Sequence, residues 1–161
     1  MSIINFMDAI IYRPSELGDE SQISGCMWAS ANLWELTDGT PESVAQWIQL
    51  CNLNELKNRI LSEERILVAT WNELVVGFIA FKRSNHLSLL FVRKEFSRRG
   101  IARQLFIRST EDFKEITVNA AETAIGFYEK IGFVRNGDRF FMYGIWAVPM
   151  KWINNSNNEF I

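Results

Sequence analysis

The hydrophobic pattern predicts mainly helices in the first third of the chain. A short strand is expected over residues 10–13 and a helix over residues 21–33. The segment Thr40-Pro41-Glu42 then combines an N-cap residue, a proline suited to the first helical turn and an acidic residue. It precedes apolar positions with the i, i+3, i+4, i+7 spacing of one helix face, namely Val44, Trp47, Ile48 and Cys51. A second helix should therefore begin at this segment, and a third should carry Leu56 and Ile60.

The middle of the chain changes to the apolar runs that are typical of strands. Strands are predicted over 66–69 and 74–81, joined by a hairpin turn at Asn72-Glu73, and further strands over 87–92 and 115–118. Helices are expected over 101–112 and 123–131. Strands joined by a crossover helix should be parallel. The segment 140–150 indicates one or two antiparallel strands, with Pro149 near an edge or an end.

A glycine-bearing basic turn follows the predicted strand 87–92. Main-chain N–H groups that converge before a helix N-terminus are free donors and carry partial positive charge, which favours phosphate. Gly100 has no Cβ that would block a close-lying pyrophosphate, and Arg98, Arg99 and Arg103 add positive charge. The sequence therefore predicts a phosphate-binding loop here.

Two motifs resemble those of the GCN5-related N-acetyltransferase (GNAT) family. Residues 97–102, Ser-Arg-Arg-Gly-Ile-Ala, are similar to the family motif Gln/Arg-x-x-Gly-x-Gly/Ala, with Ser97 departing at the first position. The segment 116–133 is similar to the second landmark, in which a strand ending in Val-Asn precedes a helix with Ala-x-x-Phe-Tyr-Glu-Lys-x-Gly-Phe. The resemblance is clearest between residues 74 and 150.

The resemblance implies a fold and an activity. The fold would be a single α/β domain over residues 1–153, with a mixed, mostly antiparallel sheet, a splayed central pair of parallel strands and flanking helices. Separately from the resemblance, the Asn- and Ser-rich composition of residues 154–161 predicts a disordered tail. The activity would be transfer of the acetyl group of acetyl-CoA to a primary amine, by direct attack in a ternary complex.

The resemblance also assigns roles to individual residues. Main-chain groups of Phe91 and Val92 would bind the pantetheine arm of coenzyme A, and Asn119 and Phe127 would border that arm on its other side. The pyrophosphate would lie on the loop formed by Arg98, Arg99, Gly100, Ile101, Ala102 and Arg103. Tyr128 would donate a proton to the departing thiolate, as a phenol can.

Several of these positions also have purely structural interpretations. Ala124, Tyr128 and Ile131 share one helix face, so the spacing alone is compatible with Tyr128 as a core aromatic residue. Gly126 would allow either close approach of a ligand or close packing against the sheet. The strand 87–92 lacks the glutamate that relatives often use as a general base. His86, Glu35, Asp38 or a chain of water molecules remain as alternatives.

Length and composition narrow the class of protein. A chain of 161 residues with 48% hydrophobic residues fits one domain of about 150 residues. No apolar run approaches the roughly 20 residues of a membrane span, and no signal peptide is recognisable, so we expect a cytoplasmic protein without membrane contact. Cys26 and Cys51, with one histidine in the chain, suggest buried thiols and no metal site. A monomer or homodimer is expected.

Charge is distributed unevenly along the chain. The net charge is −2, yet no Lys or Arg occurs between Pro14 and Leu56, whereas basic residues crowd the segment 93–108. The acidic first third, with Trp28, Trp34 and Trp47, favours a small cationic amine as acceptor, although a peptide amine remains open. The overall charge argues against nucleic acid as a partner. The remaining alternative is a non-catalytic module that senses acyl-CoA.

Overall fold

The computed structural model describes residues 9–30, 40–50, 52–62 and 64–155. It contains an eight-stranded mixed sheet in the order β1-β2-β3-β4-β5-β8-β6, with β7 also paired to β8. The strands are β1 Ile11–Pro14, β2 Arg65–Trp71, β3 Leu74–Lys82, β4 His86–Val92, β5 Glu115–Ala121, β6 Val134–Arg135, β7 Phe140–Met142 and β8 Ile145–Ile153. This confirms the predicted α/β class with a mixed, mostly antiparallel sheet.

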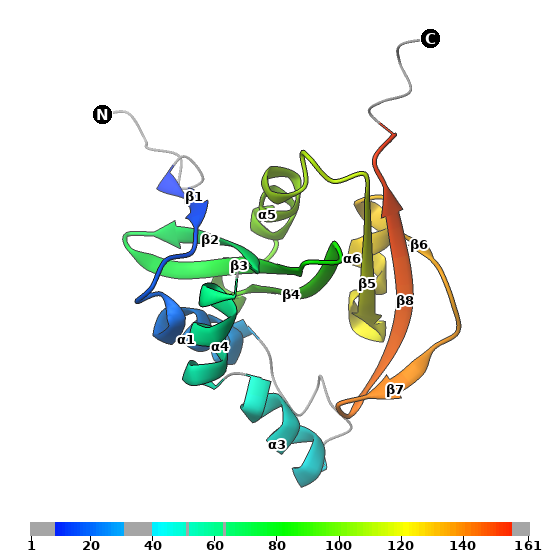
Figure 1. Cartoon of the computed structure of the whole chain (residues 1–161), viewed down its shortest axis with the longest axis horizontal. Coiled ribbons are helices and arrows are strands. Elements are labelled where there is room, and N and C mark those ends of the chain that lie inside the picture. The colour runs from blue at the N-terminus through cyan, green and yellow to red at the C-terminus, as the bar shows by residue number, and fades with distance from the viewer. Residues whose placement is uncertain (1–8, 31–39, 51, 63, 156–161) are drawn as a thin grey trace.

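Helices cover both faces of the sheet (Figure 1). They are α1 Glu20–Ser30, α3 Pro41–Leu50, α4 Leu53–Leu61, α5 Ile101–Ser109 and α6 Ile125–Lys130, with short 3-10 turns at Lys94–Phe96 and Glu122–Ala124. Helices α1 and α4 lie on one face of strands β2 to β4, and α5 lies on the other (Figure 1). None of the described helices has the length and apolarity needed to cross a membrane.

Each face of the sheet has its own hydrophobic core. The core beneath α1 and α4 contains Ile23, Met27, Leu56 and Phe78, all at most 2% exposed. The core on the α5 and α6 side contains Ile79, Leu105, Ile116, Tyr128 and Met150, among others. Successive residues of β3, Phe78 and Ile79, enter opposite cores, as the alternation of side chains along a strand requires.

The predicted hairpin turn between β2 and β3 is confirmed. Asn72 and Glu73 both adopt positive φ, 47° and 66°, as a two-residue turn with the twist of its flanking strands requires. The turn sets the register of the pair, in which Trp71 lies opposite Leu74. Asparagine tolerates this left-handed conformation, which explains why the sequence indicated the turn.

The parallel pair at the centre of the sheet is also confirmed, and it is splayed. Strands β4 and β5 are joined by α5 and pair at only two positions, His86 with Thr117 and Leu87 with Val118. Beyond Leu87, β4 continues five residues to Val92 with no further registered pair to β5. One edge of β4 is therefore open within the sheet.

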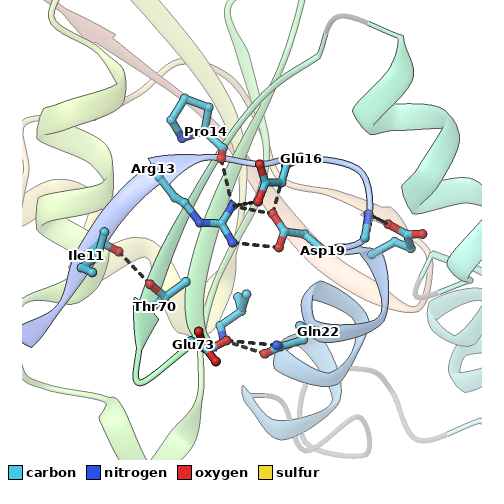
Figure 2. A network of polar contacts seen from close by, with 11 residues as sticks. Ile11, Arg13, Pro14, Glu16, Asp19, Gln22, Thr70 and Glu73 are labelled. Carbon is cyan, nitrogen blue, oxygen red and sulfur yellow. Dashed lines mark hydrogen bonds and ion pairs between the residues drawn. The ribbon is translucent and has the colours of Figure 1, made fainter.

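A polar network fixes the junction between β1 and α1 (Figure 2). The Arg13 guanidinium donates to both carboxylate oxygens of Asp19, at 2.7 and 2.9 Å. Asp19 also accepts from the main-chain N–H of Glu16 at 3.0 Å. Hydrogen bonding by Arg13 is the main reason why the pKa of Asp19 is lowered. The side chain of Gln22 links α1 to the β2–β3 hairpin, because its amide donates to the carbonyl of Glu73 and accepts from Val75 N–H.

Pro149 corrects one prediction, because it lies in the middle of β8 rather than near an edge or an end. It is opposite Asn119 of β5. On the other side of β8, β7 pairs as far as Ala147 and β6 pairs from Met150. The carbonyl of Pro149 accepts from Asn136 N–H at 2.8 Å, so the N–H that proline lacks would also point toward the gap between β6 and β7. The pairing of β8 with β5 therefore loses no hydrogen bond.

Several element boundaries also differ from the predictions, those of α5 and β5 among them. Helix α5 ends at Ser109 rather than at residue 112, because the hydroxyls of Ser109 and Thr110 bond back to carbonyls of the last turn. Strand β5 extends to Ala121, three residues beyond the predicted end. Trp34, Glu35, Asp38, Cys51 and residues 156–161 of the predicted tail 154–161 lie outside the described residues. Asn154, predicted to begin the tail, is hydrogen-bonded to the main chain of Lys114 and Phe113.

Candidate active site

A cleft of about 310 Å³ opens where β4 and β5 separate. Its walls come from both strands, from helices α3, α4 and α6, from the 3-10 turn that precedes α6, and from the β7–β8 hairpin. The predicted site residues Phe91, Asn119 and Tyr128 all line it. Residues distant in sequence thus meet where the parallel pair stops pairing.

Tyr128 lies on α6 with its side chain almost fully buried at the cleft wall. It is 7% exposed and contacts the rings of Phe127 and Phe133 edge-on, with both centroid distances at 5.3 Å. Burial raises the pKa of its phenol above the ordinary value of 10.0. The phenol therefore keeps its proton at neutral pH and can act as a donor. Tyr128 is also a member of the core, as its helix face suggested.

The open edge of β4 presents main-chain groups of particular residues. The N–H of Arg93 donates to the carbonyl of Val76 at 2.8 Å and so faces β3. Because main-chain groups alternate between the two sides of a strand, Val92 and Leu90 turn theirs toward β5, while Phe91 turns its own toward β3. The main-chain N–H and C=O groups that face the open edge are therefore those of Val92 and Leu90. Phe91 contributes its ring to the cleft.

The glycine-bearing turn leads directly into α5. Gly100 is the N-cap, with φ 79°, and an added Cβ would meet no protein atom within 4 Å. Arg98 also has positive φ, 59°, and both arginines 98 and 99 are exposed. Ile101 is buried in the core, whereas Arg103 is exposed. The turn thus offers first-turn N–H groups beside open space and positive charge.

The remaining predicted residues lie around the cleft at different depths. Asn119 is exposed on β5, opposite Pro149 of β8. Phe127 is half-buried and packs against the core without lining the cleft. Gly126 is exposed, and an added Cβ would meet nothing within 4 Å, so the interpretation of Gly126 as a packing glycine is wrong.

A second, larger hollow of about 780 Å³ lies along α5 and the end of α6. Its wall carries both charges, with Arg103, Lys114 and Lys130 beside Glu111 and Asp112, and Trp152 of β8 also lines it. Arg103, in the first turn of α5 after Gly100, thus lies between the glycine-bearing turn and this hollow.

His86 is the candidate base that the structure describes. It begins β4, lines the cleft and is half-buried, and its Nδ1 lies 2.8 Å from Thr117 Oγ1. Burial, followed by the positive charge of Lys82, lowers the pKa of its imidazole from the ordinary value of 6.5. His86 is therefore neutral at pH 7 and can accept a proton.

Three further residues line the cleft, and the sequence had singled out only one of them, Trp47. Trp47 of α3 contacts the ring of Phe91 edge-on, with centroids 6.1 Å apart. Arg59 of α4 and Tyr143 of the β7–β8 turn also line the cleft. Each belongs to a separate element, so only tertiary packing brings them together. No signal in the sequence pointed to Arg59 or Tyr143, and a role of Trp47 on the acceptor side stays a prediction.

The acidic residues of the first third lie elsewhere in the described structure. Asp19 pairs with Arg13, and the Glu20 carboxylate accepts from Gly18 N–H. No aspartate or glutamate is among the described residues that line the cleft. The described ranges also contain no cluster of three His, Cys, Asp or Glu side chains that could hold a metal ion. Cys26 is buried, and burial raises the pKa of its thiol to about 12.

Comparison with known proteins identifies a related domain. The model of the acetyltransferase (GNAT) domain family matches residues 35–154. The chain is also 29% identical over 127 residues to the uncharacterized N-acetyltransferase YafP of Escherichia coli K12, covering 79% of this chain and 83% of that protein.

Solved structures agree with this match at the level of the fold. PaiA N-acetyltransferase from Thermoplasma acidophilum, solved in complex with coenzyme A, superposes with a TM-score of 0.75 at 19% identity, covering 90% of this chain and 99% of that one. A GCN5-related N-acetyltransferase from Rhodopseudomonas palustris superposes with a TM-score of 0.72 at 22% identity, covering 89% and 95% of the two chains.

Proposed function

Because this chain belongs to the GNAT acetyltransferase family, we propose that it transfers the acetyl group of acetyl-CoA to a primary amine. The observation that carries the proposal is the cleft at the splayed β4–β5 pair, where a buried, protonated Tyr128 lies across from the open edge of β4. The coenzyme-bound relative from Thermoplasma acidophilum supports acetyl-CoA as the co-substrate.

In this proposal, coenzyme A extends from the Gly100 turn into the cleft. The pyrophosphate accepts hydrogen bonds from the N–H groups at the start of α5, with Arg98, Arg99 and Arg103 nearby. The pantetheine arm lies along the open edge of β4, where main-chain groups of Val92 and Leu90 face it. Asn119 and Phe127 border the arm from the side of β5 and α6.

The amine attacks the thioester directly. Its nitrogen lone pair forms a bond to the acetyl carbon, the carbon–sulfur bond breaks, and the electron pair of that bond leaves with sulfur as thiolate. Tyr128 donates its proton, or a hydrogen bond, to this thiolate. The apolar surroundings raise the basicity of the thiolate as they raise the pKa of the phenol, so donor and acceptor stay matched. The amine must arrive uncharged, and His86 is the described group that can take its proton.

The acceptor is a primary amine in this proposal. The preference for a small cationic amine stays a prediction. The charged residues around the cleft point to a different second group on the acceptor, as argued below.

The test combines binding with turnover. Acetyl-CoA is titrated calorimetrically into the protein, and release of the coenzyme thiol is then followed with a panel of primary amines. The Tyr128→Phe variant should bind acetyl-CoA as the wild type does. Its rate of thiol release should fall by about 100-fold or more. Tyr12→Phe is the matched control, because the Tyr12 hydroxyl is buried without a hydrogen-bond partner and lies outside the cleft.

The outcomes separate the alternatives. Wild-type turnover in Tyr128→Phe would show that Tyr128 is not the proton donor, although the protein is an acetyltransferase. Acetyl-CoA binding without thiol release on any amine would favour the acyl-CoA sensor. Absence of acetyl-CoA binding would contradict the proposed function itself.

A further inference from the structure

The charged residues that line the cleft, within the part of the chain that the structure describes, are basic. Among the described lining residues, Arg59 of α4 and Lys82 at the end of β3 carry positive charge, and neither aspartate nor glutamate is present. Lys82 lies opposite His86 in the β3–β4 register, and its charge contributes to the lowered pKa of that histidine. The charge of Lys82 therefore acts on a residue of the cleft wall.

Arg59 makes two polar contacts with neighbouring side chains. Its side chain is 12% exposed, its Nε lies 3.2 Å from Oε2 of Glu64, and its Nη2 donates to Ser88 Oγ at 3.5 Å. A guanidinium has five N–H donors in a planar fork that matches a carboxylate. The Glu64 and Ser88 contacts leave part of this fork for a further acceptor at the cleft wall.

The charges of Arg59, Glu64 and Lys82 indicate which second group on the acceptor the cleft would bind. Glu64 neutralises one of the two positive charges, so the wall keeps a single positive charge from the Arg59–Glu64 pair and Lys82 together. A carboxylate balances that charge, whereas a second ammonium on the acceptor would be repelled. The other lining residues are mixed, with Trp47, Leu89 and Phe91 as apolar and aromatic surface and Ser88, Asn119 and Thr123 as polar groups.

We propose that the acceptor is an amine that also carries a carboxylate on a small apolar or aromatic body, and that Arg59 and Lys82 bind this carboxylate. This inference rests on the proposed function.

The test uses three primary amines with one body: para-(aminomethyl)benzoate, its carboxamide, and para-bis(aminomethyl)benzene. Each is titrated calorimetrically into protein saturated with coenzyme A, so the result does not depend on turnover. The carboxylate compound should bind about tenfold more tightly than the carboxamide, and the diamine most weakly. In thiol-release assays the same order should appear in kcat/KM.

Variants then assign the effect to the basic residues. Lys82→Gln, at an exposed position, should reduce the preference for the carboxylate compound several-fold. Arg59→Gln alone would leave Glu64 buried without its partner, so the double variant Arg59→Gln with Glu64→Gln is used, and it should bring the ratio of carboxylate to carboxamide close to one. Lys57→Gln is the matched control, since Lys57 is exposed on α4 and does not line the cleft.

The results distinguish this inference from the proposed function. Equal or tighter binding of the carboxamide or the diamine would overturn the carboxylate proposal, even if both compounds are acetylated. A preference for the carboxylate that persists in the Arg59 and Lys82 variants would overturn the assigned residues. Selective binding without any thiol release would support the anion site and count against the acetyltransferase activity.

Discussion

Gly144, at the tip of the β7–β8 hairpin, lies against Ser43 in the first turn of α3 so closely that any added Cβ would overlap the Ser43 side chain. Ser43 is buried, and the Thr40 and Ser43 hydroxyls are hydrogen-bonded to each other at 2.9 Å. The neighbouring Tyr143 and Trp47 both line the cleft. The contact between hairpin and helix therefore closes one end of the proposed acceptor site.

Gly144→Ala should open this end of the cleft. The new methyl group must displace either the hairpin or α3, and the φ of 72° adds backbone strain, so we expect a loss of about 1–3 kcal/mol in stability. The KM for the acceptor amine should rise several-fold, while acetyl-CoA binds as before. Gly18→Ala is the control, because its φ of 105° imposes similar strain but no atom lies within 4 Å. An unchanged acceptor KM would show that the contact does not shape the acceptor site.

Gly100→Ala tests the phosphate-binding turn. Nothing in the protein blocks the added methyl group, so the cost to the fold is the strain of positive φ, about 1 kcal/mol. A pyrophosphate on the turn would meet the methyl group, and the Kd for acetyl-CoA should rise about tenfold or more. Titration calorimetry and thermal unfolding measure the two effects separately. If the Kd stays at the wild-type value, the pyrophosphate lies elsewhere.

His86 should titrate below its ordinary pKa of about 6.5. Burial and the charge of Lys82 disfavour the imidazolium in the folded protein, so His86 contributes stability above its unfolded pKa and that contribution is lost as the pH falls through its folded pKa. The chain has one histidine, so NMR gives a single imidazole titration. Lys82→Gln should move the midpoint to higher pH. A midpoint unchanged in that variant would mean that Lys82 does not act on His86.

If His86 is the proton acceptor, the acidic limb of the kcat/KM profile should follow the same midpoint. It should shift upward in Lys82→Gln together with the NMR titration. His86→Gln should lower the rate and remove that limb. A profile with the same acidic limb in all three proteins would assign the base to another group.

Asp19→Asn should destabilise the junction between β1 and α1. The amide keeps the shape of the side chain but removes a two-bond ion pair with Arg13, at a cost of about 1.5–3 kcal/mol. The lowered pKa of Asp19 means that its contribution is present at neutral pH and is lost as the pH falls through the folded pKa, so wild type and variant should converge in acid. Urea unfolding at neutral and acidic pH measures both.

Glu122→Gln is the corresponding control. Its partner Arg139 and Glu122 itself are 58% and 45% exposed, and an exposed pair contributes about 0–1 kcal/mol. A similar loss in both variants would show that burial of the Asp19 pair has no special effect.

Local signals in the sequence were sufficient for much of the fold. Asn72 and Glu73 mark a hairpin because the turn needs residues that tolerate positive φ. Thr40 marks the start of α3 because its carbonyl accepts the first helical hydrogen bond, from Val44 N–H. Gly100 stands out because the backbone before α5 is left-handed. Each signal depends on neighbours within a few residues.

The sequence could not reveal features that depend on packing between distant segments. Pro149 indicated an edge, yet the interruption between β6 and β7 lets an interior strand accept it. Arg59 looked like an ordinary helix residue until the fold placed it beside Ser88. The close approach of Gly144 to Ser43 joins segments about 100 positions apart, which no local pattern encodes.

The open edge of β4 has a consequence for how the protein avoids association with itself. An unpaired strand at the rim of a sheet is a template for strands of other molecules, and such edges are usually protected. This edge instead faces β5 inside the sheet, in a wedge that narrows to the His86–Thr117 pair. A foreign strand needs about 4.8 Å of lateral space along its whole length, which a wedge closed at one end does not give. The fold thereby keeps peptide groups available to a slender, flexible ligand while withholding them from other polypeptides.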